Sequence, residues 1–349
     1  RLRRRRIVKK PTLLVTGAGG YIGCVLVPRL LDNGWRVIAV DRYFFGQDLL
    51  PEHPDLEKVR QDTRSLSPGL FADVHGVIDL AALSNDPMGD AFTDETWAIN
   101  HRARARTARL AREAGVARYV IPSSCSIYGF APPTTILDEA STPNPLTVYA
   151  KANLAAEGDI LPLAADDFVV TILRFATLFG ASPRMRFDLA INGMTEGAWR
   201  TRRLPLMRDG SQWRPMIHVR DAARALEFAM TADPEAVNGR ILNAGSDDLN
   251  VQIGPLGREV ASLIPGGAEI EWYGDPDARS YRVSFARIAA LGYRTTVSIT
   301  EGVAEIVAGL ESKRLSRRAD TITLEWYRAL EEWKTRIHQV ELEGAILKA

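Results

Sequence analysis

The stretch Thr12-Leu-Leu-Val-Thr-Gly-Ala-Gly-Gly-Tyr-Ile-Gly23 decides the fold, and it stands near the start of a chain of 349 residues. Its apolar run at residues 13–15 predicts a buried parallel strand, its glycines predict a tight turn, and residues 21–31 predict a helix. Glycines have no Cβ, so a pyrophosphate can approach the backbone, and the N-terminus of the helix presents N–H groups to it.

A second apolar run, at residues 36–40, predicts the next strand and leads to Asp41, eighteen residues after the last glycine of the turn. A carboxylate there accepts hydrogen bonds from an adenosine ribose and repels a 2′-phosphate. Strand, turn, helix, strand and acid occur in order, which distinguishes a dinucleotide site from an ordinary glycine-rich turn. The unit therefore predicts NAD rather than NADP, although Arg42 keeps NADP open because its guanidinium can meet a 2′-phosphate.

The composition is typical of a soluble globular protein, with 46% hydrophobic and 25% charged residues and a net charge of +1. With so small a charge we expect neither nucleic acid nor an anionic membrane as a partner. No apolar run reaches the roughly 20 residues that a membrane span needs. Two cysteines, Cys24 and Cys125, are too few for a disulfide framework and have no metal-ligand neighbours, so we expect a cytoplasmic protein without a metal site.

Apolar strands and helices alternate through the first half of the chain, and the pattern becomes mixed after residue 180. This order predicts an α/β fold, a Rossmann doubly wound parallel sheet with a smaller mixed α/β C-terminal lobe that binds the substrate. The remaining predicted strands of the first half are residues 74–80, 118–122 and 169–174, and the helices are 93–114 and 148–161.

We expect the chain to divide into four parts. They are a disordered basic leader at 1–10, an NAD-binding Rossmann domain at 11–180, a mainly substrate-binding lobe at 181–320 with a strand near 241–244 that returns to the Rossmann sheet, and a helical extension at 321–349. The leader is interpreted as a solvated segment, with a nucleic-acid patch as the alternative. The amphipathic pattern of residues 324–346 predicts a surface helix that packs on its own domain, with a dimer helix as the alternative.

Further motifs follow the glycine turn in a fixed order: Leu80-Ala81-Ala82, Asn100, Ser123-Ser124 before Tyr128-Gly129, Tyr149, and Arg214-Pro-Met-Ile-His-Val219. With these motifs the chain resembles the extended short-chain dehydrogenase/reductases, specifically the NAD-dependent nucleotide-sugar epimerase/dehydratase family, over about residues 12–310. The resemblance implies contacts to NAD from Gly17, Gly19, Gly20, Tyr21, Ile22, Gly23, Asp41, Arg42, Asp62, Thr63, Leu80, Ala81, Ala82, Asn100 and Tyr149.

In that family a serine or threonine, a tyrosine and a lysine act together, and the resemblance assigns the first two roles to Ser124 and Tyr149. The lysine stands four residues after the tyrosine, on the same helix face, where its charge lowers the pKa of the phenol for proton exchange with a sugar hydroxyl. Here that position is Asn153, while Lys151 falls on roughly the opposite face. A retuned base, a weakened or lost activity, and a local geometry that turns Lys151 inward all remain open.

The two residues after Ser124 bear on the reaction type. Family members that resemble 4,6-dehydratases carry Asp and Glu where this chain has Cys125 and Ser126, and their absence favours an epimerase. Cys125 is a candidate thiol acid/base for the catalytic set of Ser124, Tyr149 and Asn153, or else a small buried residue.

A nucleotide sugar carries a diphosphate, which arginines bind well. The resemblance places Arg214 and Arg279 at family positions for the diphosphate. Phe187 is expected to stack on the base or to pack in the core, and Asn192 to bind the nucleotide or to cap a helix. The predicted substrate-binding residues are Ser84, Ser126, Arg186, Phe187, Asn192, Arg214 and Arg279.

These observations predict an NAD-dependent epimerase that acts on a nucleotide-diphosphate sugar through a keto-sugar intermediate. A dehydratase or net oxidoreductase of the same family is one alternative, and an NAD-binding protein that has lost catalysis is another. The resemblance also implies a homodimer built on the helices near 93–114 and 148–161.

Overall fold

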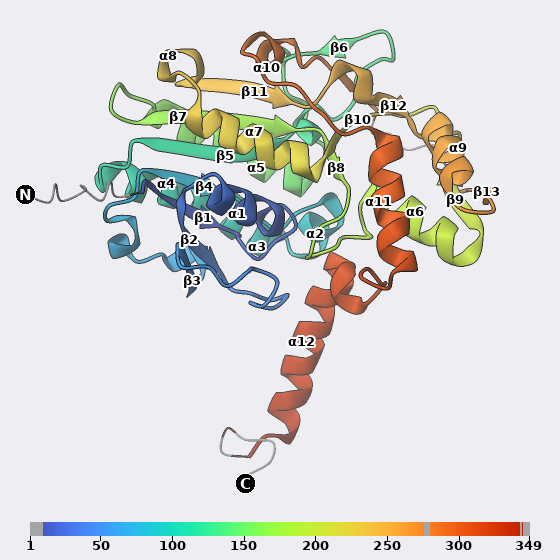
Figure 1. The fold of residues 1–349 in the computed structure, drawn as a ribbon, viewed down its shortest axis with the longest axis horizontal. Coiled ribbons are helices and arrows are strands. Elements are labelled where there is room, and N and C mark those ends of the chain that lie inside the picture. Colours follow the sequence, from blue (N-terminus) through green and yellow to red (C-terminus); the bar gives the residue numbers. More distant parts are fainter. Residues whose placement is uncertain (1–9, 276–279, 343, 345–349) are drawn as a thin grey trace, which may run out of the picture.

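The computed structural model describes residues 10–275, 280–342 and 344, which form an α/β fold around one parallel sheet (Figure 1). Its strand order is β11-β7-β5-β4-β1-β2-β3, and every neighbouring pair is parallel. This confirms the predicted doubly wound sheet. The strands are β1 (Thr12–Thr16), β2 (Arg36–Asp41), β3 (Leu56–Arg60), β4 (Gly76–Asp79), β5 (Arg118–Ser124), β7 (Val169–Phe175) and β11 (Arg240–Ala244).

Helices cover both faces of the sheet, as the near-continuous apolar strands require. Side chains of α1 and α7 form one core with the sheet, and those of α4 and α5 form another on the opposite face. The predicted helix 93–114 is divided into α3, a π-helical stretch at Trp97–Ala103, and α4. The helices that belong to the sheet domain are α1 (Gly23–Asp32), α2 (Asp86–Ala91), α3 (Thr93–Thr96), α4 (Arg104–Glu113), α5 (Val148–Ile160), α7 (Val219–Thr231) and α8 (Pro234–Val237).

The second half of the chain adds a smaller lobe beside the carboxyl ends of the strands (Figure 1). It has its own core, to which Phe179, Leu204, Met216, Val260 and Val303 contribute. Its strands are β8 (Thr177–Phe179), β9 (Arg203–Met207), β10 (Trp213–His218), β12 (Asn250–Gln252) and β13 (Glu269–Tyr273), with a β6 (Ile136–Leu137) and β14 (Arg282–Val283) pair nearby. Its helices are α6 (Ala190–Thr201), α9 (Ile253–Leu263), α10 (Ala286–Ala290) and α11 (Ile299–Glu311).

Helix α12 (Thr323–Val340) leaves the body of the molecule (Figure 1). Near its start, Trp326 donates a hydrogen bond to the Phe44 carbonyl, and Tyr327 packs edge-on against the Phe44 ring. Farther along, Trp333 is 49% and Val340 is 63% exposed. The helix thus packs on its own domain over its first part, residues 323–330, and is exposed over residues 331–340, so the predicted packing of a surface helix on its own domain holds for the first part only.

Some expectations lie outside the described residues, namely residues 1–9 of the basic leader and residues 343 and 345–349 of the C-terminal extension. Within the described ranges, none of the helices combines the length and apolar character that crossing a membrane requires.

Candidate functional site

A cleft of about 1290 Å³ runs along the carboxyl ends of the sheet strands and continues between the sheet and the smaller lobe. This is where open α/β sheets bind their ligands. The volume exceeds the several hundred Å³ of an ordinary ligand pocket. It therefore has room for a dinucleotide together with a second ligand.

The glycine turn forms one wall of the cleft. Gly17 has φ +63°, and a Cβ added there would lie 2.7 Å from the backbone nitrogen of Ala81. A Cβ on Gly23 would lie 2.3 Å from the Ala18 carbonyl oxygen. These two glycines allow the turn to pack against the loop that follows β4 and against the start of α1. Gly20 lines the cleft, and a Cβ there would meet only the Gly17 carbonyl oxygen at 3.0 Å, so the backbone on this side is open to a pyrophosphate.

Asp41 ends β2 beside the turn. Its carboxylate accepts hydrogen bonds from Gly19 N at 3.0 Å and from Tyr43 N at 2.6 Å. Burial raises the pKa of this carboxyl, and the backbone N–H groups oppose the rise. Gly19 is therefore a support of Asp41 rather than part of the cleft lining, whereas Asp41 itself lines the cleft.

Arg42 also lines the cleft, but its charge is already engaged. Its Nη1 lies 3.0 Å from Asp62 Oδ2, and its guanidinium stacks over the Phe44 ring. A hydrogen bond from Arg64 lowers the pKa of Asp62 to about 2. Because the Arg42 guanidinium is already paired with the Asp62 carboxylate, it is less suited to bind a 2′-phosphate, which supports NAD over NADP at this end of the cleft. Tyr21, Ile22, Thr63, Leu80, Ala81 and Ala82 line the same end.

Asn100 is fully buried in the π-helical stretch and lies behind the lining. Its amide accepts from Leu83 N at 2.8 Å and donates to Leu83 O at 2.9 Å. Asn100 thus fixes the loop after β4, and it can affect ligand binding only by holding that loop in position.

Ser124 and Tyr149 meet the cleft from β5 and α5. Helix α5 begins at a Thr147 cap, whose hydroxyl accepts a hydrogen bond from Ala150 N, and this cap sets Tyr149 in the first turn. Ser124 Oγ accepts from Ser126 N at 3.1 Å. Burial raises the pKa of the Tyr149 phenol.

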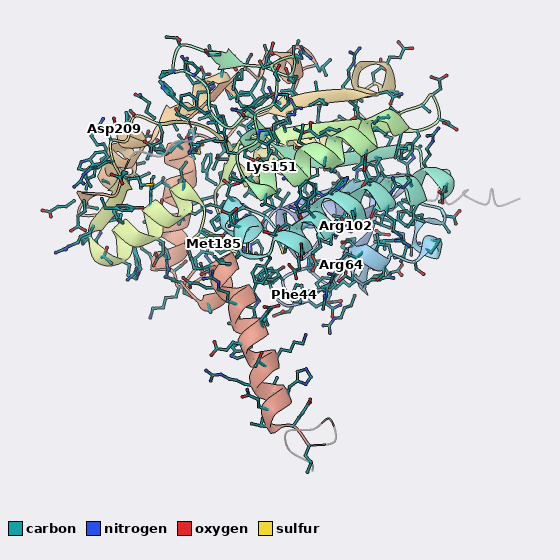
Figure 2. The ribbon with its side chains drawn as sticks, turned by 180° about the vertical axis from the view of Figure 1, so that it is seen from behind. Phe44, Arg64, Arg102, Lys151, Met185 and Asp209 are labelled. Atoms are coloured by element: carbon teal, nitrogen blue, oxygen red, sulfur yellow. The ribbon has the colours of Figure 1, made fainter. Side chains whose placement is uncertain are left out.

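Asn153 is buried behind Tyr149 and bridges two groups. Its amide nitrogen donates to Tyr149 O at 2.9 Å, and its Oδ1 accepts from Arg104 Nη1 at 3.0 Å. Arg104 itself lines the cleft, and sequence analysis missed it. The available signal was its spacing, since it follows Asn100 by one helical turn. Lys151 is exposed on α5 and does not line the cleft (Figure 2).

The residues after Ser124 differ in their surroundings. Cys125 is buried outside the cleft lining, and its thiol donates to the Arg174 carbonyl at 3.3 Å. Burial raises the pKa of this thiol. Ser126 lines the cleft, and its buried Oγ has no hydrogen-bond partner within the described part of the chain. A partner from a ligand would satisfy it.

Arginines stand at the far part of the cleft. Arg186 is paired with Asp188 at 2.9 Å and donates to the Ser84 carbonyl at 2.8 Å. Arg214 lies over the Tyr281 ring, 5.5 Å from its centre. Arg186, Arg214 and Ser84 all line the cleft. Arg279 lies outside the described residues.

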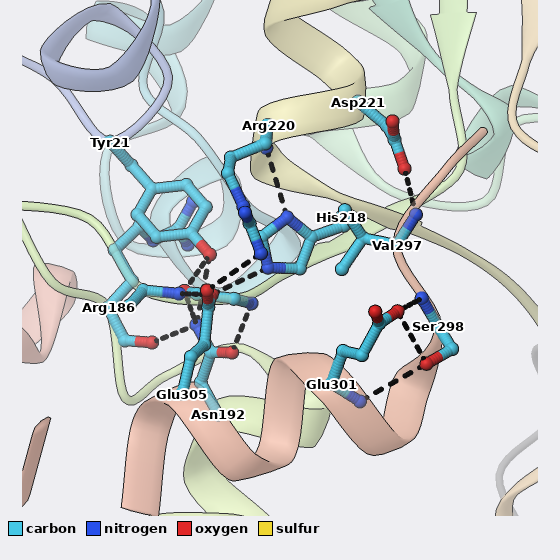
Figure 3. Close-up of polar contacts among 12 residues, drawn as sticks. Tyr21, Arg186, Asn192, His218, Arg220, Asp221, Val297, Ser298, Glu301 and Glu305 are labelled. Atoms are coloured by element: carbon cyan, nitrogen blue, oxygen red, sulfur yellow. Dashed lines mark hydrogen bonds and ion pairs between the residues drawn. The ribbon is translucent and has the colours of Figure 1, made fainter. Parts of the chain in front are cut away.

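Asn192 and Phe187 lie away from the cleft lining. Asn192 accepts from Gly180 N at 2.8 Å and donates to the Tyr21 hydroxyl and to Arg186 O, as Figure 3 shows. This buried network ties the glycine turn to the smaller lobe. Phe187 packs in a core with Ile306. No group of three or more His, Cys, Asp or Glu side chains in the described ranges is arranged to hold a metal ion.

Comparisons with known proteins agree with this geometry. The model of the NAD dependent epimerase/dehydratase family matches residues 13–245. UDP-glucose 4-epimerase from Mycolicibacterium smegmatis is 27% identical over 319 residues, covering 86% of this chain and 98% of that protein. Divinyl chlorophyllide a 8-vinyl-reductase from Zea mays is 30% identical over 193 residues, which cover 52% of this chain and 44% of that longer protein.

Among solved structures, MoeE5 in complex with UDP-glucuronic acid and NAD is 30% identical, with a TM-score of 0.75. The match covers 86% of this chain and 99% of MoeE5. The glycine turn, Asp41, Ser124 and Tyr149 lie within the segment that the family model matches. The chain belongs to the NAD-dependent epimerase/dehydratase family.

Proposed function

We propose that the protein is an NAD-dependent epimerase of a nucleotide-diphosphate sugar. The observation that carries this proposal is one continuous cleft that holds the glycine turn and Asp41, then Ser124 and Tyr149, then Arg214. Two of the named relatives, the UDP-glucose 4-epimerase and MoeE5 in its complex with UDP-glucuronic acid, act on or bind UDP-sugars, which supports UDP as the nucleotide.

NAD, when bound, supplies reversible hydride acceptance at a sugar carbon. The turn and Asp41 hold its pyrophosphate and ribose. Tyr149 exchanges the proton of the sugar hydroxyl, and Ser124 hydrogen-bonds to the same oxygen. Arg214 and Arg186 bind the diphosphate, and the unpartnered Ser126 hydroxyl binds the sugar.

The residues after Ser124 favour epimerisation over loss of water. A dehydratase needs acid and base groups beside the sugar, and Cys125 is buried outside the cleft while Ser126 carries no titratable group near neutral pH. At these two positions the protein therefore lacks the acid and base groups that loss of water requires. Net oxidation needs no such pair, and the accumulation of NADH distinguishes it from epimerisation.

The experiment is incubation of the purified protein with a panel of nucleotide sugars, followed by chromatography and mass spectrometry. We expect one sugar to be converted to an isomer of the same mass, and Tyr149→Phe to lower the rate at least ~100-fold because general acid–base catalysis contributes about that much. Lys151→Gln, on the same helix but exposed, is the matched control and should keep the rate. Loss of water, net accumulation of NADH, or no conversion of any sugar would contradict the epimerase.

Two further features belong to the proposal. We infer a homodimer through α4 and α5, to be tested by light scattering of the purified protein. Cys24 and Cys125 are both buried and unpaired, which supports the cytoplasmic location that we propose.

A further inference from the structure

Arg104 stands at the start of α4 with its guanidinium turned beneath the carboxyl ends of β4 and β5. It is 3% exposed. Its nitrogens donate to the carbonyl oxygens of Ala81 at 3.1 Å, Pro122 at 3.0 Å and Asp79 at 3.4 Å, and to Asn153 Oδ1 at 3.0 Å.

These partners share one property, which is that all are neutral oxygens. A guanidinium stays protonated in proteins, and a buried charge is costly unless an opposite charge accompanies it. Across the described ranges, no carboxylate forms an ion pair with Arg104, and the nearby Asp79 carboxylate is occupied by hydroxyls of Thr16 and Tyr119. The guanidinium is thus held at the wall of the cleft by neutral oxygens, and the buried Asp79 carboxylate acts on it through its charge without forming an ion pair with it.

We propose that Arg104, fixed by Asn153, is the cation that acidifies the Tyr149 phenol. Asn153 fixes the two groups relative to each other, because its amide oxygen accepts from Arg104 and its amide nitrogen donates to the main-chain carbonyl of Tyr149. Arg104 and Tyr149 both line the same cleft. The charge that the family keeps on the helix of the tyrosine has moved to the neighbouring helix. Arg104 is a positioning residue that acts through Tyr149, and its catalytic consequence rests on the function proposed above.

Other charged groups face Tyr149 as well. Burial has the largest effect on the phenol and raises its pKa, and the negative charge of Asp86 on α2 raises it further. Arg104 and Arg186 lower the pKa, and Arg104 has the larger effect of the two. Asp79 and Tyr119 face Arg104 from β4 and β5. Substitution of Arg104 by an uncharged residue removes the largest charge that lowers the pKa of the phenol, while burial and Asp86 still raise it. The pKa of the phenol should therefore rise.

The test is a tyrosinate absorbance titration of the full chain, in which the titration of Tyr149→Phe is subtracted so that only Tyr149 remains. The same subtraction is made in Arg104→Met and Arg104→Lys. We expect the phenol transition in Arg104→Met to move up by about one pH unit or more, which is the size of effect of a close charge, and Arg104→Lys to retain most of the native position. Arg109→Met, exposed on the same helix, is the control and should not move it.

A second variant keeps the test informative if Arg104→Met does not fold. Asn153→Asp has the same shape and can still accept from Arg104, but its carboxylate neutralises the guanidinium, so it should move the transition in the same direction. An unchanged transition in a folded Arg104→Met or Asn153→Asp protein would overturn the proposal, as would a native phenol that stays protonated until the protein unfolds.

The titration requires no substrate, so its outcome is independent of whether any nucleotide sugar is converted. Where a substrate is found, the pH profile of kcat/KM provides the second measurement. Its phenol limb should shift upward in Arg104→Met and return toward the native position in Arg104→Met with Asn153→Lys.

Discussion

At the scale of single residues, the turn and strand ends leave little choice of side chain. Gly17 adopts a left-handed backbone conformation. A Cβ added to it would lie only 2.7 Å from the backbone nitrogen of Ala81. Asp41 uses both carboxylate oxygens to hold the turn and the following loop. The end of the cleft at the glycine turn, where we propose that NAD binds, is therefore fixed by backbone contacts that a single methyl group would disturb.

Gly17→Ala should weaken NAD binding about tenfold or more, because a left-handed backbone at a residue with a Cβ costs roughly 1–2 kcal/mol and the methyl group displaces the loop after β4 at Leu80 and Ala81. Calorimetric titration with NAD measures this. Gly158→Ala is the matched control, since a Cβ at Gly158 meets nothing within 4 Å, and it should bind NAD as the native protein does. Native affinity in Gly17→Ala would contradict this account of the turn.

At the scale of elements, α5 is joined to the sheet by a buried ion pair. Glu157 lies 2.6 Å from Arg174 of β7 and accepts a hydrogen bond from Ser123 of β5 at 2.5 Å. Both charged side chains are 4% exposed. This contact fixes the helix that presents Tyr149 relative to the strand that presents Ser124.

Glu157→Gln should lower the free energy of unfolding by about 3 kcal/mol, because it leaves the Arg174 charge buried without its counter-ion. Glu57→Gln, which removes one half of the exposed Arg36–Glu57 pair between β2 and β3, is the matched control and should change it by less than about 1 kcal/mol. Urea unfolding followed by circular dichroism gives both values. Equal changes in the free energy of unfolding for the two substitutions would show that the buried ion pair stabilises the fold no more than the exposed one.

At the scale of the whole molecule, the sequence predicted the half of the fold in which apolar strands are continuous. It missed β3, because this edge strand (Leu-Glu-Lys-Val-Arg) is half exposed and has no apolar run. It also missed the π-helical stretch, because the helix-favouring composition of residues 93–114 does not indicate a local change of hydrogen-bond register.

The candidate site divides in the same way. Ser124 and Tyr149 follow local motifs and both line the cleft. Arg104 belongs to another helix, and only the packing of α4 against α5 brings it to Asn153. Asn192 and Phe187 have residue types that suit a ligand, but tertiary packing places them in buried contacts instead. Sequence motifs thus indicated which elements form the site, while side-chain partners between elements depended on the fold.

The most direct test of the central claim is the approach to equilibrium from both sides of one epimer pair. Purified protein with NAD is incubated with either UDP-sugar of a pair, such as UDP-glucose and UDP-galactose, and the mixtures are separated by chromatography while NADH absorbance is followed. The account predicts that for one such pair both mixtures reach the same ratio of isomers, with unchanged sugar mass and no net NADH. Failure of every pair to interconvert, or conversion accompanied by net NADH or loss of water, would contradict it.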